Sequence, residues 1–124
     1  MATDIRRGQI YEIDWNPARG SEQAGVRPGL VIQNDIANAV SGYPVTMVCA
    51  VSSKLKGYPS MVRVTPSPEN GLTAISEVNS AQIMTVQKDR LGSLRGRLSS
   101  ADMAQVDEKL AYMLSIAIQP MPTS

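Results

Sequence analysis

A short segment between two strand-like runs holds an acid and a base at a spacing suited to phosphate chemistry. Residues 20–28, with the sequence GSEQAGVRP, place Glu22 and Arg27 among two glycines and a proline. The glycines permit backbone conformations closed to other residues, and the proline fixes the chain just before an apolar run. A restrained arginine, planar and always charged, suits bidentate contact with phosphate. The alternative is a polar connection in which Glu22 and Arg27 only pair with each other.

The composition excludes several kinds of catalytic site. The chain has no histidine and a single cysteine, Cys49. Structural zinc sites, disulfides and the Ser-His-Asp arrangement are thereby ruled out. Cys49 lies in the apolar run 45–51, where the expected role is that of a small buried thiol. We assign Cys49 no function, and we expect neither a metal nor a cofactor.

Basic residues gather in two stretches, although the formal net charge is only +1. No acidic residue occurs between positions 36 and 68, and a second basic group occupies positions 90–97. The basic residues of the two stretches are Lys54, Lys56 and Arg63, then Arg90, Arg95 and Arg97. Local clusters, and not net charge, attract phosphates, so a nucleic-acid partner is possible. A solvated basic face is the alternative.

The length and hydropathy indicate a single globular domain over residues 1–124. The hydrophobic fraction of 43% and the charged fraction of 19% are typical of soluble proteins. No apolar run approaches the length of a membrane span, and the charged start is not followed by the apolar core of a secretory signal. We therefore expect a cytoplasmic protein with no membrane partner.

Apolar patterns of period two predict five or six short strands. We expect strands over 8–15, 29–33, 45–53, 61–65 and 91–98, and one or two more within 72–86. The first strand predicts half-burial, because one set of positions alternates with the other: Ile10, Glu12 and Asp14 against Tyr11, Ile13 and Trp15. The last should carry its basic residues outward. Residues 34–40 predict a capped helical turn, and residues 54–59 a basic loop.

The end of the chain changes to a helical period. Ser99 to Asp102 fits a capping box, and apolar residues then follow at helical spacing as far as Ala117. Pro120 and Pro122 should close this helix. The elements together predict a mainly β fold with a C-terminal helix, built as a small β-barrel or a strongly bent sheet whose open side the helix covers.

The segment 20–28 and the apolar strand after it resemble the signature of the MazF/PemK family of toxins. The resemblance covers nearly the whole chain, through RGQIY at 7–11, LVIQND at 30–35 and QIMTVQKDRL at 82–91. It implies an SH3-like barrel of the CcdB/Kid/MazF type, a homodimer, and an mRNA interferase that cuts single-stranded RNA at a short preferred sequence without a metal. It also implies a MazE-like antitoxin as partner, encoded beside the toxin.

The resemblance assigns roles to particular residues. Ser52 corresponds to the family's second catalytic position, usually threonine, and keeps the hydroxyl. Glu22 matches an acidic position of the same loop, so the catalytic set is Arg27, Ser52 and Glu22. Ala81 and Asn79 depart from the family, because some relatives carry a catalytic acid and arginine there. The candidate RNA contacts are Gln23, Ser53, Lys54, Lys56, Arg63 and Gln82. Ser53 should point away from Ser52 if the strand extends that far.

Attack by the RNA 2′-hydroxyl on the adjacent phosphate would give a 2′,3′-cyclic phosphate and a 5′-hydroxyl. Using arginine as a general base at pH 7 costs roughly 8 kcal/mol or more, so Arg27 is expected to act as electrostatic stabiliser and as a candidate proton donor. Glu22 is the candidate base, and a simple ion pair with Arg27 is equally open. Two other functions stay open, a gyrase-targeting toxin of the same fold and a non-catalytic RNA-binding module.

Overall fold

The computed structural model describes residues 4–15 and 25–117, so Glu22 and Gln23 lie outside the described residues. The strands are β1 (Gln9–Asp14), β2 (Val26–Val31), β3 (Val45–Ser52), β4 (Met61–Val64), β5 (Ser76–Gln87) and β6 (Leu91–Arg97). The helices are α1 (Asp35–Asn38), the 3-10 turn η1 (Lys88–Arg90) and α2 (Ser100–Leu114). The mainly β fold with one long terminal helix is confirmed. The region 72–86 contributes one long strand.

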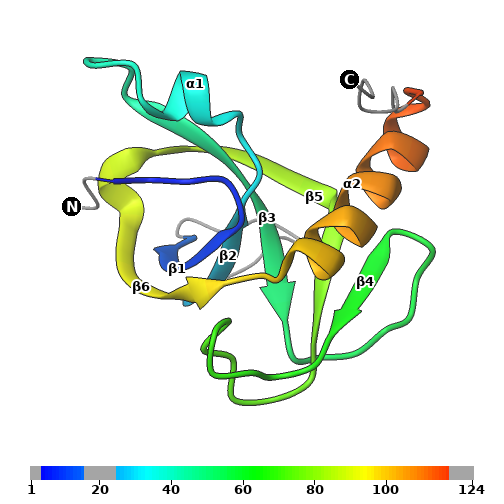
Figure 1. Ribbon diagram of the computed structural model, residues 1–124. Helices are drawn as coiled ribbons and strands as arrows, with labels where there is room; N and C mark the ends of the chain where they lie inside the picture. The colour runs from blue at the N-terminus through cyan, green and yellow to red at the C-terminus, as the bar shows by residue number, and fades with distance from the viewer. Residues whose placement is uncertain (1–3, 16–24, 118–124) are drawn as a thin grey trace.

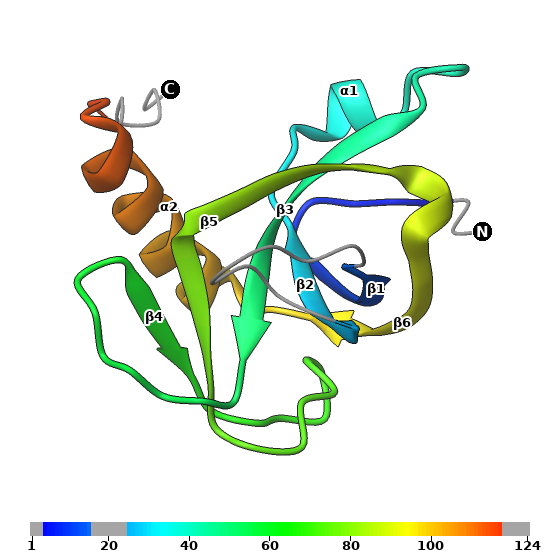
Figure 2. The same ribbon diagram turned by 180° about the vertical axis from the view of Figure 1, so that it is seen from behind.

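All six strands form one antiparallel sheet in the order β4-β5-β3-β2-β1-β6 (Figure 1). The sheet bends strongly at β5, as Figure 2 shows. There the partner of β3 changes from Ile83, opposite Cys49, to Val78, opposite Val51, and the extra residues of β5 form a bulge. Among the described residues no ladder joins the edge strands β4 and β6. The sheet is therefore strongly bent and not a closed barrel.

The bending buries both faces of the central strands. One apolar cluster lies between the sheet and α2 and contains Ile10, Leu30 and Val106. A second lies on the other face of β1 and contains Tyr11 and Ile13. The predicted half-burial of β1 holds for Glu12 and Asp14, which keep solvent exposure, whereas Ile10 on the same face is fully buried. A fully buried aliphatic side chain of this kind contributes about 1.5–3 kcal/mol.

The helix α2 begins as predicted and ends earlier. The side chain of Ser99 accepts a hydrogen bond from the backbone N–H of Asp102 at 3.1 Å, which caps the first turn. Ser115 then adopts a left-handed conformation with φ of 55°, and this ends the helix at Leu114. The predicted extension to Ala117 is wrong. Only the first half of the apolar stripe packs on β4 and β5. Within the described part of the chain, no helix is long and apolar enough to cross a bilayer.

Candidate active site

The pocket that contains the predicted catalytic residues opens where β2 and β3 separate. The ladder between these two strands stops at Gly29 of β2 and Ala50 of β3. In the described structure, the start of β2 then pairs only with β1 and the end of β3 only with β5. A cavity of about 280 Å³ is lined by residues of both diverging ends, including Arg27 and Ser52. Pro28 contributes no N–H, which favours the end of a ladder at this position.

Arg27 is on strand β2 and not in a loop, which corrects the prediction from the sequence. Its backbone pairs with Ile13 of β1, and its carbonyl oxygen accepts a hydrogen bond from the indole Nε1 of Trp15 at 3.0 Å. At Gly29 an added Cβ would meet the end of the Ile13 side chain, so glycine leaves room for Ile13 to pack over β2. The backbone of Arg27 is therefore held firmly, whereas its side chain is exposed beside the pocket.

Ser52 is the last residue of β3, and it is half-buried in the pocket lining. Its Oγ accepts a hydrogen bond from the backbone N–H of Lys54 at 3.1 Å. The hydroxyl hydrogen is then left to donate to a phosphate oxygen. Ser53 is exposed and also lines the pocket. We expected the hydroxyls of Ser52 and Ser53 to point to opposite faces if the strand included both residues. The strand β3 ends at Ser52, so this alternation does not extend to Ser53.

Arg95 of β6 belongs to the pocket, although the sequence reasoning placed it on an outward face. Its Nη1 donates to Glu12 Oε1 at 2.8 Å, and its Nη2 donates to the carbonyl oxygen of Gly71 at 2.8 Å. These bonds fix the guanidinium in the wall of the cavity. Arg27 and Lys54 also line the cavity, and none of its described lining residues is acidic, although Arg95 is paired with Glu12. The cavity is therefore electropositive and suited to an anion.

The loop of residues 65–75 completes the wall of the pocket and is tightly held. Asn70, only 2% exposed, accepts hydrogen bonds from two backbone N–H groups of the loop and donates to the carbonyl oxygen of Thr65 at 2.9 Å. Gly71 has a φ of 66°, and an added Cβ there would clash with the backbone of Arg95. Glycine is required for this close approach, which keeps the loop against β6.

The basic loop of residues 54–59 is confirmed, and it begins at the pocket. Lys54 is part of the pocket lining, whereas Lys56 and Arg63 are exposed and lie outside it. The Lys56 ammonium is 6.0 Å from the centre of the Tyr58 ring. The structure thus brings one of the three predicted basic contacts to the cavity, and RNA binding by the other two stays a prediction.

Glu77 of β5 was missed by the sequence reasoning. It is 3% exposed, and its carboxylate accepts a hydrogen bond from the backbone N–H of Lys56 at 2.7 Å. This bond is the main reason why the pKa of Glu77 is lowered from 4.5, although burial acts in the opposite direction. Its stabilising contribution is therefore complete above pH 4.5 and is lost as the pH falls through the lowered pKa. No sequence signal marks it, because its partners come from a distant loop.

Gln82 lies outside the pocket, and so do Asn79 and Ala81, the two positions that depart from the family. They occupy the bulge of β5, where the Oδ1 of Asn79 accepts hydrogen bonds from Ser60 Oγ at 3.1 Å and from the backbone N–H of Ala81 at 3.0 Å. The Nδ2 of Asn79 donates to Gln82 Oε1 at 3.4 Å. The side chain of Asn79 therefore has hydrogen-bond partners within the bulge. An RNA contact by Gln82 stays a prediction.

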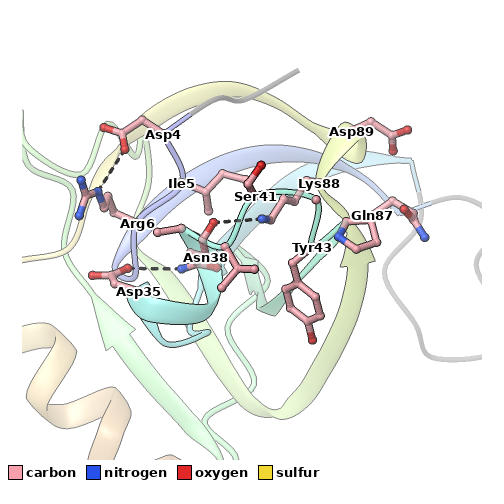
Figure 3. A pocket seen from close by; sticks show the side chains of 14 residues that line it. Asp4, Ile5, Arg6, Asp35, Asn38, Ser41, Tyr43, Gln87, Lys88 and Asp89 are labelled. Atoms are coloured by element: carbon pink, nitrogen blue, oxygen red, sulfur yellow. Dashed lines mark hydrogen bonds and ion pairs between the residues drawn. The ribbon is translucent and has the colours of Figure 1, made fainter.

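A larger cavity, of about 520 Å³, contains none of the predicted site residues. Figure 3 shows that several of its charged groups already have partners within the cavity. Lys88 Nζ donates to the carbonyl oxygen of Asn38 at 3.0 Å, and Arg6 Nε lies 3.2 Å from Asp4 Oδ1. Size alone therefore does not identify the active site, and the smaller electropositive pocket is the better candidate.

Cys49 is fully buried, as expected, and burial raises the pKa of its thiol to about 12. A thiol with so little thiolate at neutral pH is a poor nucleophile and a poor metal ligand. Among the described residues, no group of three or more cysteine or acidic side chains is placed to hold a metal ion, so none is assigned that role.

Residues 6–114 match the model of the PemK-like, MazF-like toxin of type II toxin-antitoxin systems. The chain is 38% identical to endoribonuclease MazF9 of Mycobacterium tuberculosis, over 90% of this chain and 98% of that protein. A mycobacterial endoribonuclease solved in complex with its cognate antitoxin matches with a TM-score of 0.73 and 28% identity, over 94% of this chain and 97% of that one. MazF of Deinococcus radiodurans matches with a TM-score of 0.77 and 25% identity, over 93% and 100%.

The fold, the electropositive pocket and these matches define a class of small β proteins that act as endoribonucleases. The chain belongs to the PemK/MazF family of toxins of type II toxin-antitoxin systems. The family predicted from the sequence is therefore confirmed.

Proposed function

We propose that this toxin cleaves single-stranded RNA at a short preferred sequence, in the pocket between the diverging ends of β2 and β3. The observation that carries the proposal is that Arg27 and Ser52, distant in the sequence, line one electropositive cavity together with Lys54 and Arg95. A phosphodiester between two sugars is the anion that such a set of donors suits. Family membership supports the same activity.

The mechanism uses the RNA 2′-hydroxyl as nucleophile. Arg27 stabilises the charge that develops on the phosphate oxygens, and the Ser52 hydroxyl donates a further hydrogen bond to them. As the 2′-oxygen bonds to phosphorus, the bond to the 5′-oxygen breaks, and that oxygen takes a proton from Arg27 or from water. Glu22, outside the described residues, or a group of the substrate removes the proton from the 2′-hydroxyl. No step requires a metal.

The partners follow from the family. A relative of the same fold was solved in complex with its cognate antitoxin, and we infer a MazE-like antitoxin for this toxin as well. Binding of an antitoxin over the pocket would block RNA. We further infer a homodimer, in which two pockets share one RNA groove, and a cytoplasmic location, because messenger RNA is the substrate.

The activity is tested by incubating the purified protein with a long single-stranded RNA in EDTA and mapping the fragments. Discrete cuts at a recurring short sequence are the expected result. A protein that binds the RNA without cutting it would be an RNA-binding module instead. Inhibition of supercoiling by DNA gyrase in a parallel assay, with the RNA intact, would identify a gyrase-targeting toxin.

Ser52→Ala should lower the single-turnover cleavage rate about 10- to 100-fold, since a hydrogen bond to a charged group contributes about 1.5–3 kcal/mol. Ser52→Thr should cut at the parent's rate or slightly faster, because the hydroxyl is kept and the added methyl restricts the rotamer. This variant also keeps the acceptor for the Lys54 N–H. Ser53→Ala should have little effect. An inactive Ser53→Ala beside an active Ser52→Ala would make Ser53 the phosphate contact.

Replacing both Lys54 and Lys56 by glutamine should weaken the binding of RNA, and by the same factor whatever the RNA sequence. The slope of log K against log salt should flatten by about 0.7 for each phosphate that the protein no longer neutralises, as single strands require. The matched control is Lys109→Gln on α2, outside the pocket, and its slope should equal that of the parent. An unchanged slope in the double variant would place the RNA groove elsewhere on the protein.

A further inference from the structure

The carboxylate of Glu77 is buried beneath the basic loop and is bonded mainly to the backbone of that loop. Its Oε1 accepts from the N–H of Lys56 at 2.7 Å, and its Oε2 accepts from the N–H of Gly57 at 3.1 Å. The third partner is Arg63 Nη2, at 3.4 Å. The Arg63 side chain is 58% exposed, so its ion pair with Glu77 is partly screened by solvent. The two backbone N–H groups are therefore the main partners of this carboxylate.

A buried carboxylate is costly unless its oxygens are satisfied. In this fold the loop supplies the donors, so Glu77 and the loop stabilise each other. Separating the loop from Glu77 would break both backbone hydrogen bonds and leave the exposed Arg63 and water as the partners of the carboxylate. The loop is therefore held in one conformation, even though its residues 53–59 are all exposed.

A second anchor lies next to Glu77. In the β3–β5 ladder Glu77 is directly opposite Ser52, and the Oγ of Ser52 accepts from the N–H of Lys54. The loop is thus bonded at its start by a pocket residue and at its middle by Glu77. Lys54, which lines the pocket, is bonded through its own N–H at the first of these points, two residues before the second at Lys56.

We propose that Glu77 is a positioning residue that holds the loop 53–59 in the conformation that binds RNA. The inference rests on the proposed function. Glu77 itself does not line the pocket, and it acts through the loop backbone. A loop ordered before binding loses less entropy when RNA arrives, so its lysines contribute more to affinity.

The test compares Glu77→Gln with the parent and with Glu108→Gln, a change of an exposed acid on α2. The amide variant keeps one acceptor oxygen, but it places an NH₂ group against a backbone donor. Hydrogen exchange of the Lys56 and Gly57 amides should accelerate about 10-fold or more in Glu77→Gln, while amides of the β3–β5 ladder keep the protection of the parent. Glu108→Gln should match the parent at every amide.

Cleavage kinetics separate positioning from general destabilisation. Arg27 and Ser52 lie on strands, so in Glu77→Gln the KM for RNA should rise about 10-fold while kcat at saturating RNA changes less than about 3-fold. A variant that was only less stable would lose active protein, and kcat would fall at constant KM. That pattern, or unchanged exchange at Lys56 and Gly57, would overturn the proposal.

If Glu77→Gln does not fold, Glu77→Asp provides the same comparison, since it keeps the charge but is too short to reach both amides of the loop. Exchange and KM should again change together. If the parent itself fails to cut RNA, the proposed function fails, whereas the exchange measurement still decides whether Glu77 fixes the loop. Faster exchange with an unchanged KM would show that the ordered loop does not serve RNA binding.

Discussion

Arg27→Ala should lower the rate of RNA cleavage by about 10²-fold or more, the loss expected when a donor to the transition-state charge is removed. The fold should survive, because the side chain of Arg27 is exposed. The hydrogen bond that is lost, from Nη1 to the carbonyl oxygen of the neighbouring Val26 at 3.3 Å, is local and exposed. The indole of Trp15 donates to the backbone carbonyl of Arg27, which alanine retains. Stability should therefore change by less than about 0.5 kcal/mol.

Single-turnover cleavage and a thermal melt measure the two effects separately. Arg6→Ala is the control, an exposed arginine that lines the larger cavity and should leave both values at those of the parent. Arg27→Lys keeps the charge but loses the bidentate geometry, so its rate should lie between those of the parent and the alanine variant. A well-folded Arg27→Ala that cuts within a few-fold of the parent would remove Arg27 from the mechanism.

An RNA with a single 2′-deoxy sugar at the cut position should survive intact, since that sugar lacks the internal nucleophile. The matched all-ribose RNA should give fragments that end in a 2′,3′-cyclic phosphate and begin with a 5′-hydroxyl, and it should do so in EDTA. Mass spectrometry of the fragments identifies both ends. The deoxy RNA should still bind, because the phosphates that the pocket contacts are unchanged.

Efficient cutting of the deoxy RNA would mean that water is the nucleophile and would contradict the mechanism. A requirement for added Mg²⁺ would point to a metal-assisted reaction.

Local sequence by itself determined the class of fold, most of the strands and the choice of Arg27, and the family resemblance added Ser52. Period-two patterns place β1, β3, β4 and β6 to within one residue at each end, whereas β2 begins at Val26 and not at Gly29. The motifs at 7–11, 20–28, 30–35 and 82–91 were sufficient to indicate the family. These features depend on residues close together in the chain. The burial of Ile10 was not predictable in this way, because it depends on how far the sheet bends.

Only the tertiary structure decided how the pocket is made. A strand pattern does not say where two paired strands separate, and the cavity exists because the β2–β3 ladder ends at Gly29. Arg95 reads as an outward base in the sequence, but its bonds to Glu12 and Gly71 hold it in the pocket wall. Glu77 carries no local signal at all. Its role arises because a distant loop brings backbone N–H groups to a buried carboxylate, which sequence spacing does not encode.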